Sequence, residues 1–253
     1  MYLSHLLIDV GDNPDRPRPG RVWLRNRYRV HQRLSMAFPS RERAVNDPEF
    51  LQPYEPDDFA DGDIHVPRGD SQGFLYRVDT SFISTRNGRA NSVVILVLSA
   101  RKPNWDYAFH NAQHFLAAEP VCCVWSPLFS AGDLLRFRLQ ANPTRRIKRQ
   151  ATEADASPGS TRVPVAQGHL LEWLERKLDG AEVVLSPEPP GMQTGYVWFK
   201  KDGGAAGQLF SVVFDGLIRV QEPEALLAAV ASGIGSAKCF GFGLLSVIPY
   251  RES

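Results

Sequence analysis

The first 125 residues predict strands and helices in an order that few folds share. Apolar runs predict strands, helical spacing of apolar residues predicts helices, and Asn87-Gly88 is a hairpin signal between two of the strands. The expected order is strand, helix, strand, strand, helix, strand, over Tyr2–Val10, Arg25–Phe38, Phe74–Ser84, Ser92–Ala100, Trp105–Ala117 and Val121–Trp125. This βαββαβ order is that of a ferredoxin-like α+β unit.

The second half follows an expected linker at Ser126–Gly132 and repeats this order more loosely. Leu134–Ala141 alternates apolar with basic or polar residues, as a strand with one face toward a core does. Gln167–Leu178 carries leucines at helical spacing. The other expected elements are a hairpin of Tyr196–Lys201 and Gln208–Phe214, a turn at Asp215-Gly216, a helix opened by Pro223, and a glycine-rich loop leading into a final strand.

The expected helix in Arg25–Phe38 contains a histidine and a tyrosine. Asn26 is a candidate N-cap, and one apolar stripe is formed by Val30, Leu34, Ala37 and Phe38. Tyr28, His31 and Ser35 fall on a different face. A histidine has an unperturbed pKa of about 6.5, so His31 can exchange a proton with a hydroxyl near neutral pH, and Tyr28 can orient the imidazole. By itself this pattern also fits a surface histidine on a basic helix.

Charge is segregated along the chain, although the net charge is only +1. Nine arginines and one acid, Glu42, lie between Arg16 and Arg43. The stretch Asp47–Asp79 has the opposite balance, with nine acids against Arg68 and Arg77. A local excess of arginine suits a polyanionic partner such as a nucleic acid.

Two further segments have features of nucleic-acid contact. The run Arg136–Arg149 holds six cations and no acid, which suits either a charged strand face that follows a phosphate backbone or a solvated strand edge. We favour the phosphate contact because the N-terminal arginine cluster repeats the pattern. Gly233–Gly243 holds four glycines and Lys238 but does not match a P-loop, so its backbone can approach either phosphates or a neighbouring strand.

The sequence indicates no metal and no cofactor. Its three cysteines, Cys122, Cys123 and Cys239, form no paired zinc motif, and we expect all three to be buried as small apolar residues. His110 and His114 lack the glutamate of H-E-x-x-H, and we see no acidic cluster spaced for two metals. No apolar run is long enough to cross a membrane and the N-terminus lacks a cationic leader, so we expect a cytoplasmic protein without membrane contact.

Several segments occur in an order shared with one family. They are MYLS at the start, Y-x-x-H-Q-x-L-x-x-x-F-P over Tyr28–Pro39, FRLQANPTR over Phe137–Arg145, RVP over Arg162–Pro164, WLERKL over Trp173–Leu178, VVFDGLI over Val212–Ile218 and GIGSAKCFGFGLLS over Gly233–Ser246. In this combination the chain resembles the CasE family, the CRISPR repeat-processing endoribonuclease of type I-E Cascade.

The resemblance implies two tandem ferredoxin-like (RRM-like) domains, which we expect at 1–125 and 133–253. It also implies metal-independent cleavage of CRISPR repeat RNA at the base of its stem-loop, in which the 2′-hydroxyl attacks the adjacent phosphate and leaves a 2′,3′-cyclic phosphate and a 5′-hydroxyl. The family's catalytic histidine and tyrosine fall on His31 and Tyr28. The implied partners are the repeat RNA, whose 3′ hairpin stays bound in the crRNA, and the other Cascade subunits.

The sequence departs from the family at Met36, where some members carry a lysine. We therefore expect another cation at the reacting phosphate, with Arg33 and Lys238 as candidates. The residues expected to contact RNA are Arg27, Arg136, Arg138, Arg145, Arg146, Lys148, Lys200, Lys201, Gly233, Gly235, Gly241 and Gly243.

Two other functions remain open from the sequence. The first is a subunit that binds the crRNA hairpin with little or no cleavage, which the departure at Met36 would explain. The second is an RRM-like module for single-stranded RNA, which is weaker because no strand shows the aromatic pattern that stacks bases. The acidic segment Asn46–Gly73 has no counterpart in the family pattern.

Overall fold

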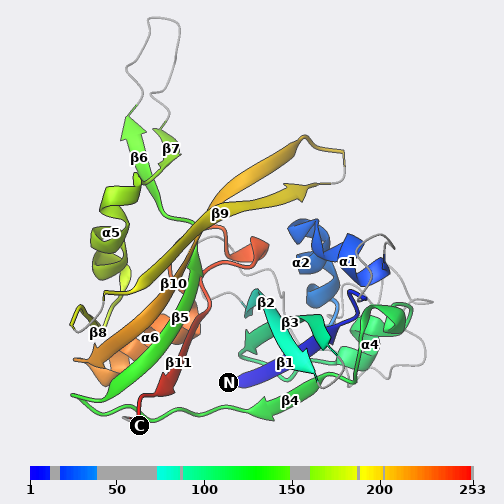
Figure 1. Ribbon diagram of the computed structural model, residues 1–253, viewed down its shortest axis with the longest axis horizontal. Coiled ribbons are helices and arrows are strands. Elements are labelled where there is room, and N and C mark those ends of the chain that lie inside the picture. The colour runs from blue at the N-terminus through cyan, green and yellow to red at the C-terminus, as the bar shows by residue number, and fades with distance from the viewer. Residues whose placement is uncertain are drawn as a thin grey trace, which may run out of the picture.

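The computed structural model describes residues 1–11, 18–38, 73–85, 88–148, 160–186, 189–201 and 203–251, and consists of two sheets with their helices (Figure 1). Nearly all of the acidic segment Asn46–Gly73 and the turn residue Asn87 lie outside the described residues. The two sheets use strands from the two halves of the chain. None of the described helices has the length and apolar character needed to cross a bilayer.

The N-terminal sheet has the strand order β2-β3-β1-β4 and its pairs are antiparallel. Its strands are β1 (Tyr2–Ile8), β2 (Phe74–Thr85), β3 (Gly88–Ser99) and β4 (Val121–Val124). Its helical segments are α1 (Pro19–Leu24), α2 (Arg27–Ser35), α4 (Trp105–Phe109) and the 3₁₀ helix η2 (Gln113–Phe115). The predicted ferredoxin-like order of the first half is therefore confirmed.

The helices of this half differ from the prediction in two places. The structure contains a short helix, α1, that was not predicted from the sequence; it has Pro19 in its first turn, where a proline removes no helical hydrogen bond. The helix expected over Trp105–Ala117 ends at Phe109. It ends early because the chain at Phe115 and Ala117 forms backbone hydrogen bonds with the end of β1.

The C-terminal sheet has the order β11-β5-β10-β8, with β9 paired along the first part of β10. Its strands are β5 (Leu134–Ala141), β8 (Ala181–Val184), β9 (Gly191–Lys200), β10 (Ala206–Val220) and β11 (Leu245–Pro249). Its helical segments are η3 (Gln167–His169), α5 (Leu170–Lys177), α6 (Pro223–Ser232) and η4 (Lys238–Phe240). With β5, β8, β10 and β11 as its four strands, this sheet repeats the ferredoxin-like order.

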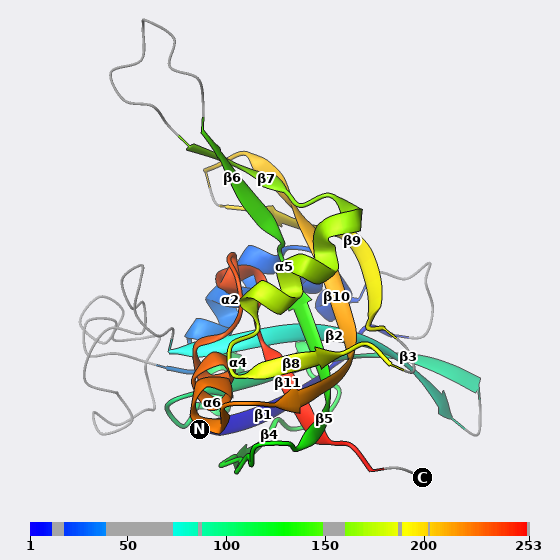
Figure 2. The ribbon, with the colours of Figure 1, turned by 90° about the vertical axis from the view of Figure 1, so that its left-hand side faces the viewer.

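A separate hairpin of β6 (Thr144–Lys148) and β7 (Ser160–Pro164) projects from this half (Figures 1 and 2). It divides the basic run Arg136–Arg149, which we had expected on one strand face. Arg136 and Arg138 lie on β5, whereas Arg145 and Arg146 lie on β6 in a different sheet.

Two local predictions in the sequence are wrong. No turn occurs at Asp215-Gly216, because β10 runs through both residues. The glycine allows close packing there, since a Cβ on Gly216 would lie 3.0 Å from the Pro190 side chain and 3.2 Å from the Phe137 ring. None of the three cysteines is buried as expected: Cys122 and Cys239 are partly exposed, and Cys123 is exposed because it lies on β4 at the edge of its sheet.

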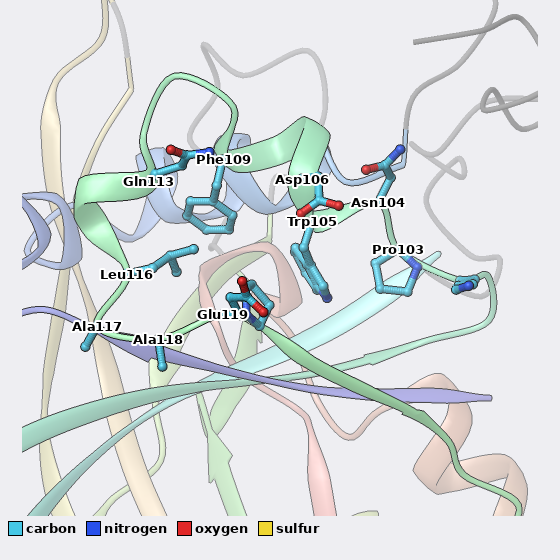
Figure 3. A pocket seen from close by; sticks show the side chains of 12 residues that line it. Pro103, Asn104, Trp105, Asp106, Phe109, Gln113, Leu116, Ala117, Ala118 and Glu119 are labelled. Atoms are coloured by element: carbon cyan, nitrogen blue, oxygen red, sulfur yellow. The ribbon is translucent and has the colours of Figure 1, made fainter. Parts of the chain in front are cut away.

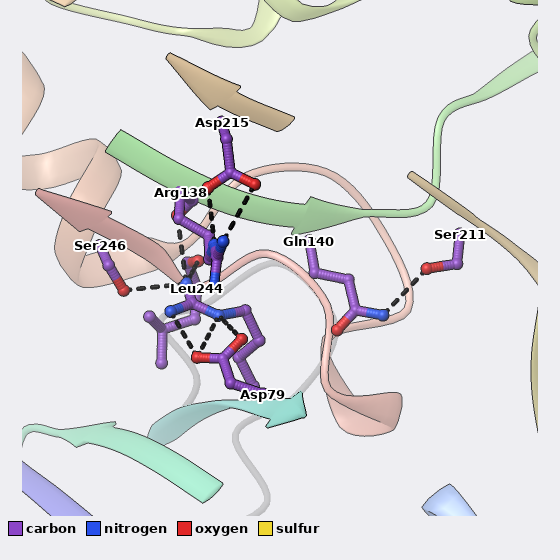
Figure 4. Close-up of polar contacts among 8 residues, drawn as sticks. Asp79, Arg138, Gln140, Ser211, Asp215, Leu244 and Ser246 are labelled. Carbon is purple, nitrogen blue, oxygen red and sulfur yellow. Dashed lines mark hydrogen bonds and ion pairs between the residues drawn. The ribbon is translucent and has the colours of Figure 1, made fainter. Parts of the chain in front are cut away.

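Arg77 on β2 joins the two sheets, and Figure 4 labels its partners Asp79, Leu244 and Ser246. Its side chain is buried, and its Nε forms an ion pair with Asp79 at 2.8 Å. Its Nη1 donates to the backbone oxygens of Arg138 and Leu244 and to Ser246 Oγ, at 3.1, 3.3 and 2.9 Å. One guanidinium thus holds β2 of the N-terminal half against β5 and β11 of the C-terminal half.

Candidate functional site

Helix α2 begins where the sequence predicts it. Asn26 Oδ1 accepts a hydrogen bond from the Tyr28 backbone N–H at 3.2 Å, which caps the helix. Val30 and Leu34 are fully buried, and this burial fixes the rotation of the helix so that Tyr28 and His31 are half-buried at its surface. Ser35, expected on the same face as His31, is instead buried, and its Oγ donates to the His31 backbone oxygen at 2.8 Å.

The His31 imidazole lies on an aromatic surface formed by β2. Its ring is stacked on Phe74, with centroids 5.3 Å apart, and runs nearly parallel to Tyr76 at 6.4 Å. The Nδ1 atom is buried. A ligand must therefore approach this ring from the side of its other nitrogen, Nε2. The core of the N-terminal half sets the plane of the imidazole.

Tyr76 connects α2 to the glycine-rich loop. Its hydroxyl lies 3.0 Å from the Arg27 backbone oxygen and 3.2 Å from the Cys239 backbone oxygen, and it donates toward both. Burial raises the pKa of Tyr76, so the hydroxyl keeps its proton and remains a donor. The glycine-rich loop is therefore held beside the helix that carries His31, as Figure 1 shows for α2 and the segment leading to β11.

The β9–β10 hairpin is docked on the start of α2 by Asn26. Asn26 Nδ2 donates to the Lys200 backbone oxygen at 2.9 Å, and the Lys200 backbone N–H donates to Asn26 Oδ1 at 3.0 Å. The ammonium of Lys201 lies 5.9 Å from the centre of the Tyr28 ring, which is within cation–π range. The structure thus brings the predicted lysines to the predicted tyrosine. The sequence identified Asn26 only as a cap, and nothing in its pattern signals this second role.

Arg27 has an incompletely satisfied guanidinium beside the same helix start. Its Nη1 is buried and has no hydrogen-bond partner among the residues that the structure describes. Burial lowers the pKa of Arg27, an effect that the nearby Asp79 carboxylate partly opposes. A buried charged donor without a partner costs free energy, which an arriving anion can offset. Arg27 is therefore well suited to contact a phosphate.

The two candidate cations for the reacting phosphate lie in different settings. Arg33 points to the region of α4, where its Nη1 donates to the Ala108 backbone oxygen and to Asn111 Oδ1 at 2.9 and 2.7 Å. Lys238 lies on η4, which packs against α2, and donates to the Ser232 backbone oxygen at 2.5 Å. Burial lowers the pKa of Lys238. Both cations are therefore held by protein acceptors; we favour Lys238 because the helix that carries it, η4, packs against α2, whereas the Arg33 guanidinium is bound at α4.

The four glycines expected to contact RNA serve first to fold their own loop. All four have positive φ angles, at Gly233, Gly235, Gly241 and Gly243. A Cβ on Gly233 would lie 2.8 Å from the Leu75 side chain of β2, and one on Gly243 would lie 2.8 Å from the Ile234 backbone oxygen. Of the two alternatives left open by the sequence, close packing against a neighbouring strand is therefore observed at Gly233.

The remaining predicted RNA contacts fall at two places away from α2. Arg136 and Arg138 are exposed on β5, but Arg138 forms an ion pair with Asp215 at 2.6 Å, and this hydrogen bond raises the pKa of Arg138 (Figure 4). Arg145 and Arg146 are exposed on β6. The side chain of Lys148 lies outside the described residues. The predicted cations thus form separate groups rather than one face.

A further cavity lies away from these residues. It has a volume of about 960 Å³, lies between α4, η2 and the start of β4, and is lined by Trp105, Phe109 and Glu119 among others (Figure 3). It contains none of the predicted site residues. No group of three or more His, Cys, Asp or Glu side chains in the described ranges is arranged to hold a metal ion.

Comparisons with known proteins cover nearly the whole chain. The family model described as "CRISPR associated protein" matches residues 1–249. The chain is 32% identical over 166 residues to the CRISPR-associated endoribonuclease Cse3 of Thermus thermophilus, covering 62% of this chain and 73% of that protein. It is 28% identical over 252 residues to the CRISPR system Cascade subunit CasE of Escherichia coli K12, covering 98% and 100%.

Solved structures agree with these matches. The structure of CRISPR endoribonuclease Cse3 bound to a 19-nucleotide RNA has a TM-score of 0.65 and 27% identity, and covers 98% of this chain and 100% of that one. The crystal structure of Cas6e from E. coli K-12 has a TM-score of 0.60 and 26% identity, and covers 99% and 100%. The family match, the full-length relatives and the shared pair of ferredoxin-like folds lead to one conclusion. The chain belongs to the CasE family of CRISPR-associated proteins.

Proposed function

We propose that this protein is an endoribonuclease that cuts CRISPR repeat RNA at the base of its stem-loop, without a metal ion, and then stays bound to the hairpin as a Cascade subunit. The observation that supports this most is the setting of His31. Its imidazole is fixed on β2, Nδ1 faces the protein, and Tyr28, Arg27 and the docked lysine hairpin surround the same helix start. The relatives named as endoribonucleases, one of them solved with RNA, support the reaction type.

The proposed reaction uses the RNA's own nucleophile. The bond from the 2′-oxygen to phosphorus forms, the bond from phosphorus to the 5′-oxygen breaks, and the products end in a 2′,3′-cyclic phosphate and a 5′-hydroxyl. One proton leaves the 2′-hydroxyl and one proton is added to the departing 5′-oxygen. His31 carries out one of these transfers through Nε2, and Tyr28 assists from the same helix, a contribution of typically about 10²- to 10⁴-fold.

The cations have two distinct tasks in this proposal. Arg27 on α2 and Lys238 on η4 belong to the two segments that the Tyr76 hydroxyl joins through backbone oxygens. Both cations stabilise the negative charge that grows on the phosphate oxygens. Lys200 and Lys201 extend the positive surface along β9 and hold the stem through its phosphates and 2′-hydroxyls. Because Arg138 is neutralised by Asp215, it contributes less to RNA binding than the sequence suggests.

A chemically altered substrate tests the reaction without changing the protein. We expect a labelled repeat RNA to be cut once at the base of its stem, equally fast with and without a chelator. The same RNA with a 2′-deoxy nucleotide at the cut position should bind with unchanged affinity and remain intact. Cleavage of the deoxy RNA, or loss of activity with the chelator, would contradict the proposal.

A hairpin-binding subunit with little cleavage remains the second candidate. It is favoured by Met36, and by the contacts that hold Arg33 on Ala108 and Asn111 and away from a ligand. This candidate predicts that native and 2′-deoxy repeat RNA show the same, negligible single-turnover rate while both bind tightly. A native rate at least about 10²-fold above the deoxy rate would exclude it.

A further inference from the structure

A second cationic site lies across the glycine-rich loop from α2. It is a pocket of about 560 Å³, and its lining includes five positively charged side chains: Arg145, Arg146, Arg162, Arg176 and Lys177. They come from three elements, namely β6, β7 and α5. The sequence pattern suggested only the two on β6 as RNA contacts, because the other three are distant in the chain.

The charge of this pocket is not balanced by the protein. Its lining includes no carboxylate, and within the described ranges none of the five cations forms an ion pair. Like charges gathered around one hollow repel one another and raise the local positive potential. Such an arrangement is destabilising by itself and is relieved by an anion, so the pocket has the chemistry of a phosphate site.

The pocket is physically linked to the candidate reaction centre. Its lining includes Gly235 and Ser236 of the glycine-rich loop, and Ser236 Oγ donates to Asn142 Oδ1 at 3.3 Å. Asn142 Nδ2 in turn donates to the Phe210 backbone oxygen at 2.6 Å, which anchors this side of the loop to β10. Cys239, whose backbone oxygen meets Tyr76 beside His31, is three residues from Ser236, a span of at most about 11 Å.

The dimensions of the pocket favour one strand over a duplex. A volume of about 560 Å³ is in the range of pockets that enclose a small molecule, so it can take one nucleotide unit with its phosphate. A double-stranded stem is recognised along its outer surface and presents its phosphates in a rigid A-form arrangement. A single strand can bend into a hollow that has cations on three sides.

We propose that this pocket binds the single-stranded RNA that flanks the hairpin, by enclosing a backbone phosphate between β6, β7 and α5. The proposal rests on the proposed function, since it takes the repeat RNA as the ligand. It assigns Arg162, Arg176 and Lys177 to RNA binding. It also places the stem and the single-stranded flank of the RNA at different sites. The stem lies along the β9–β10 hairpin, and the flank crosses the glycine-rich loop into the pocket.

The test compares the full-length protein with the triple variant R162Q/R176Q/K177Q. The matched control is K102Q/R219Q/R251Q, which removes the same charge from three exposed cations outside the pocket lining. Three RNAs carry a 2′-deoxy nucleotide at the cut position: the bare hairpin, the hairpin with a 5′ flank and the hairpin with a 3′ flank. Affinity is measured against salt concentration, and urea unfolding confirms that each variant is folded.

We expect one flank to strengthen binding to the wild-type protein and to the control. In the pocket variant that flanked RNA should bind at least about tenfold more weakly, and the slope of log affinity against log salt should fall by about 2 for three lost contacts. The bare hairpin should bind within twofold of wild type. Equal losses for the bare and flanked RNAs, or an unchanged salt slope for the flanked RNA, would overturn the proposal.

The outcomes separate this proposal from the function on which it rests. If the wild-type protein cuts native repeat RNA but its affinity for both flanked RNAs equals that for the bare hairpin, the pocket assignment is wrong and the endoribonuclease proposal stands. If no repeat RNA binds to the wild-type protein, both are wrong.

Discussion

The two ferredoxin-like sheets have the same strand order but present different chemistry. In the N-terminal half, the candidate catalytic side chains lie on a helix packed on buried aromatic residues, and the His31 ring is held by Phe74 and Tyr76. In the C-terminal half, the candidate binding cations whose side chains the structure describes are exposed, and they lie on β5, β6, β7, α5 and the β9–β10 hairpin. The comparison suggests that proton transfer requires a geometry fixed by the core, whereas phosphate binding uses exposed charge.

The two halves meet at adjacent residues of one strand. On β2, Tyr76 reaches α2 and the glycine-rich loop, while Arg77 reaches β5 and β11. Successive side chains of a strand point to opposite faces, so Tyr76 and Arg77 contact different parts of the molecule. Strand β2 therefore connects β5 and β11 of the C-terminal half to the helix that carries His31. Substitutions at Arg77, Lys238 and Asn26 test how much each of these residues contributes to stability, cleavage rate and RNA binding.

The largest effect on stability is expected at Arg77. Replacing it in Arg77→Met leaves Asp79 and three acceptors without their donor, and breaking such a buried pair costs about 3–5 kcal/mol. The matched variant Arg138→Met breaks an exposed ion pair on the neighbouring strand and should cost less than about 1 kcal/mol. Urea unfolding measures the free energy of unfolding of both variants. If the two variants lost the same free energy, the contacts of Arg77 would not hold the two halves together.

A smaller effect, on rate rather than stability, is expected at Lys238. If its ammonium stabilises the reacting phosphate, Lys238→Met should slow single-turnover cleavage by about 10²- to 10³-fold. Burial lowers the pKa of Lys238, so the wild-type rate should fall as pH rises through that lowered pKa, at a pH where an exposed lysine would still be charged. Lys238→Arg should extend the active range upward, because arginine stays protonated.

If the cleavage rates of the wild type and of Lys238→Arg changed with pH in the same way at high pH, this role of Lys238 would be contradicted. In that case Arg27, whose buried Nη1 has no hydrogen-bond partner among the described residues, would be the remaining candidate at the helix start.

The smallest effect is expected at Asn26, where two roles can be separated. Asn26→Asp retains a good helix cap but loses the Nδ2 donor and turns a carboxylate oxygen toward the Lys200 backbone oxygen, so the hairpin should undock and RNA affinity should fall while α2 keeps its cap. Asn26→Ala loses both roles and should also destabilise the protein by about 1 kcal/mol. If Asn26→Asp bound RNA as well as wild type, the docking of the hairpin would not matter for binding.

Features that depend on neighbouring residues were predictable from the sequence. The N-cap at Asn26, the buried stripe of α2 and the helix opened by Pro223 follow from local chemistry, and the structure contains all three. The strand order of the first half followed from the order of the patterns. The boundaries 1–125 and 133–253 and the roles of the site residues stay predictions.

Features that depend on distant residues were not predictable. The turn expected at Asp215-Gly216 is a strand because both residues pair with β5, and the helix expected to reach Ala117 stops because the chain beyond it forms backbone hydrogen bonds with the end of β1. The neutralisation of Arg138 by Asp215 and the contacts of Arg33 with Ala108 and Asn111 likewise join segments that are about 75 residues apart in the chain. No local pattern encodes such pairs.

The central claim is that one imidazole, held by the core of the N-terminal half, performs proton transfer while the cations elsewhere bind the RNA. Its most direct test is to measure single-turnover cleavage and RNA affinity together for His31→Ala, with the exposed His114→Ala as the matched control. We predict that His31→Ala lowers the cleavage rate by at least about 10²-fold with affinity within twofold of wild type, and that His114→Ala changes neither. An unchanged cleavage rate in His31→Ala would contradict the claim.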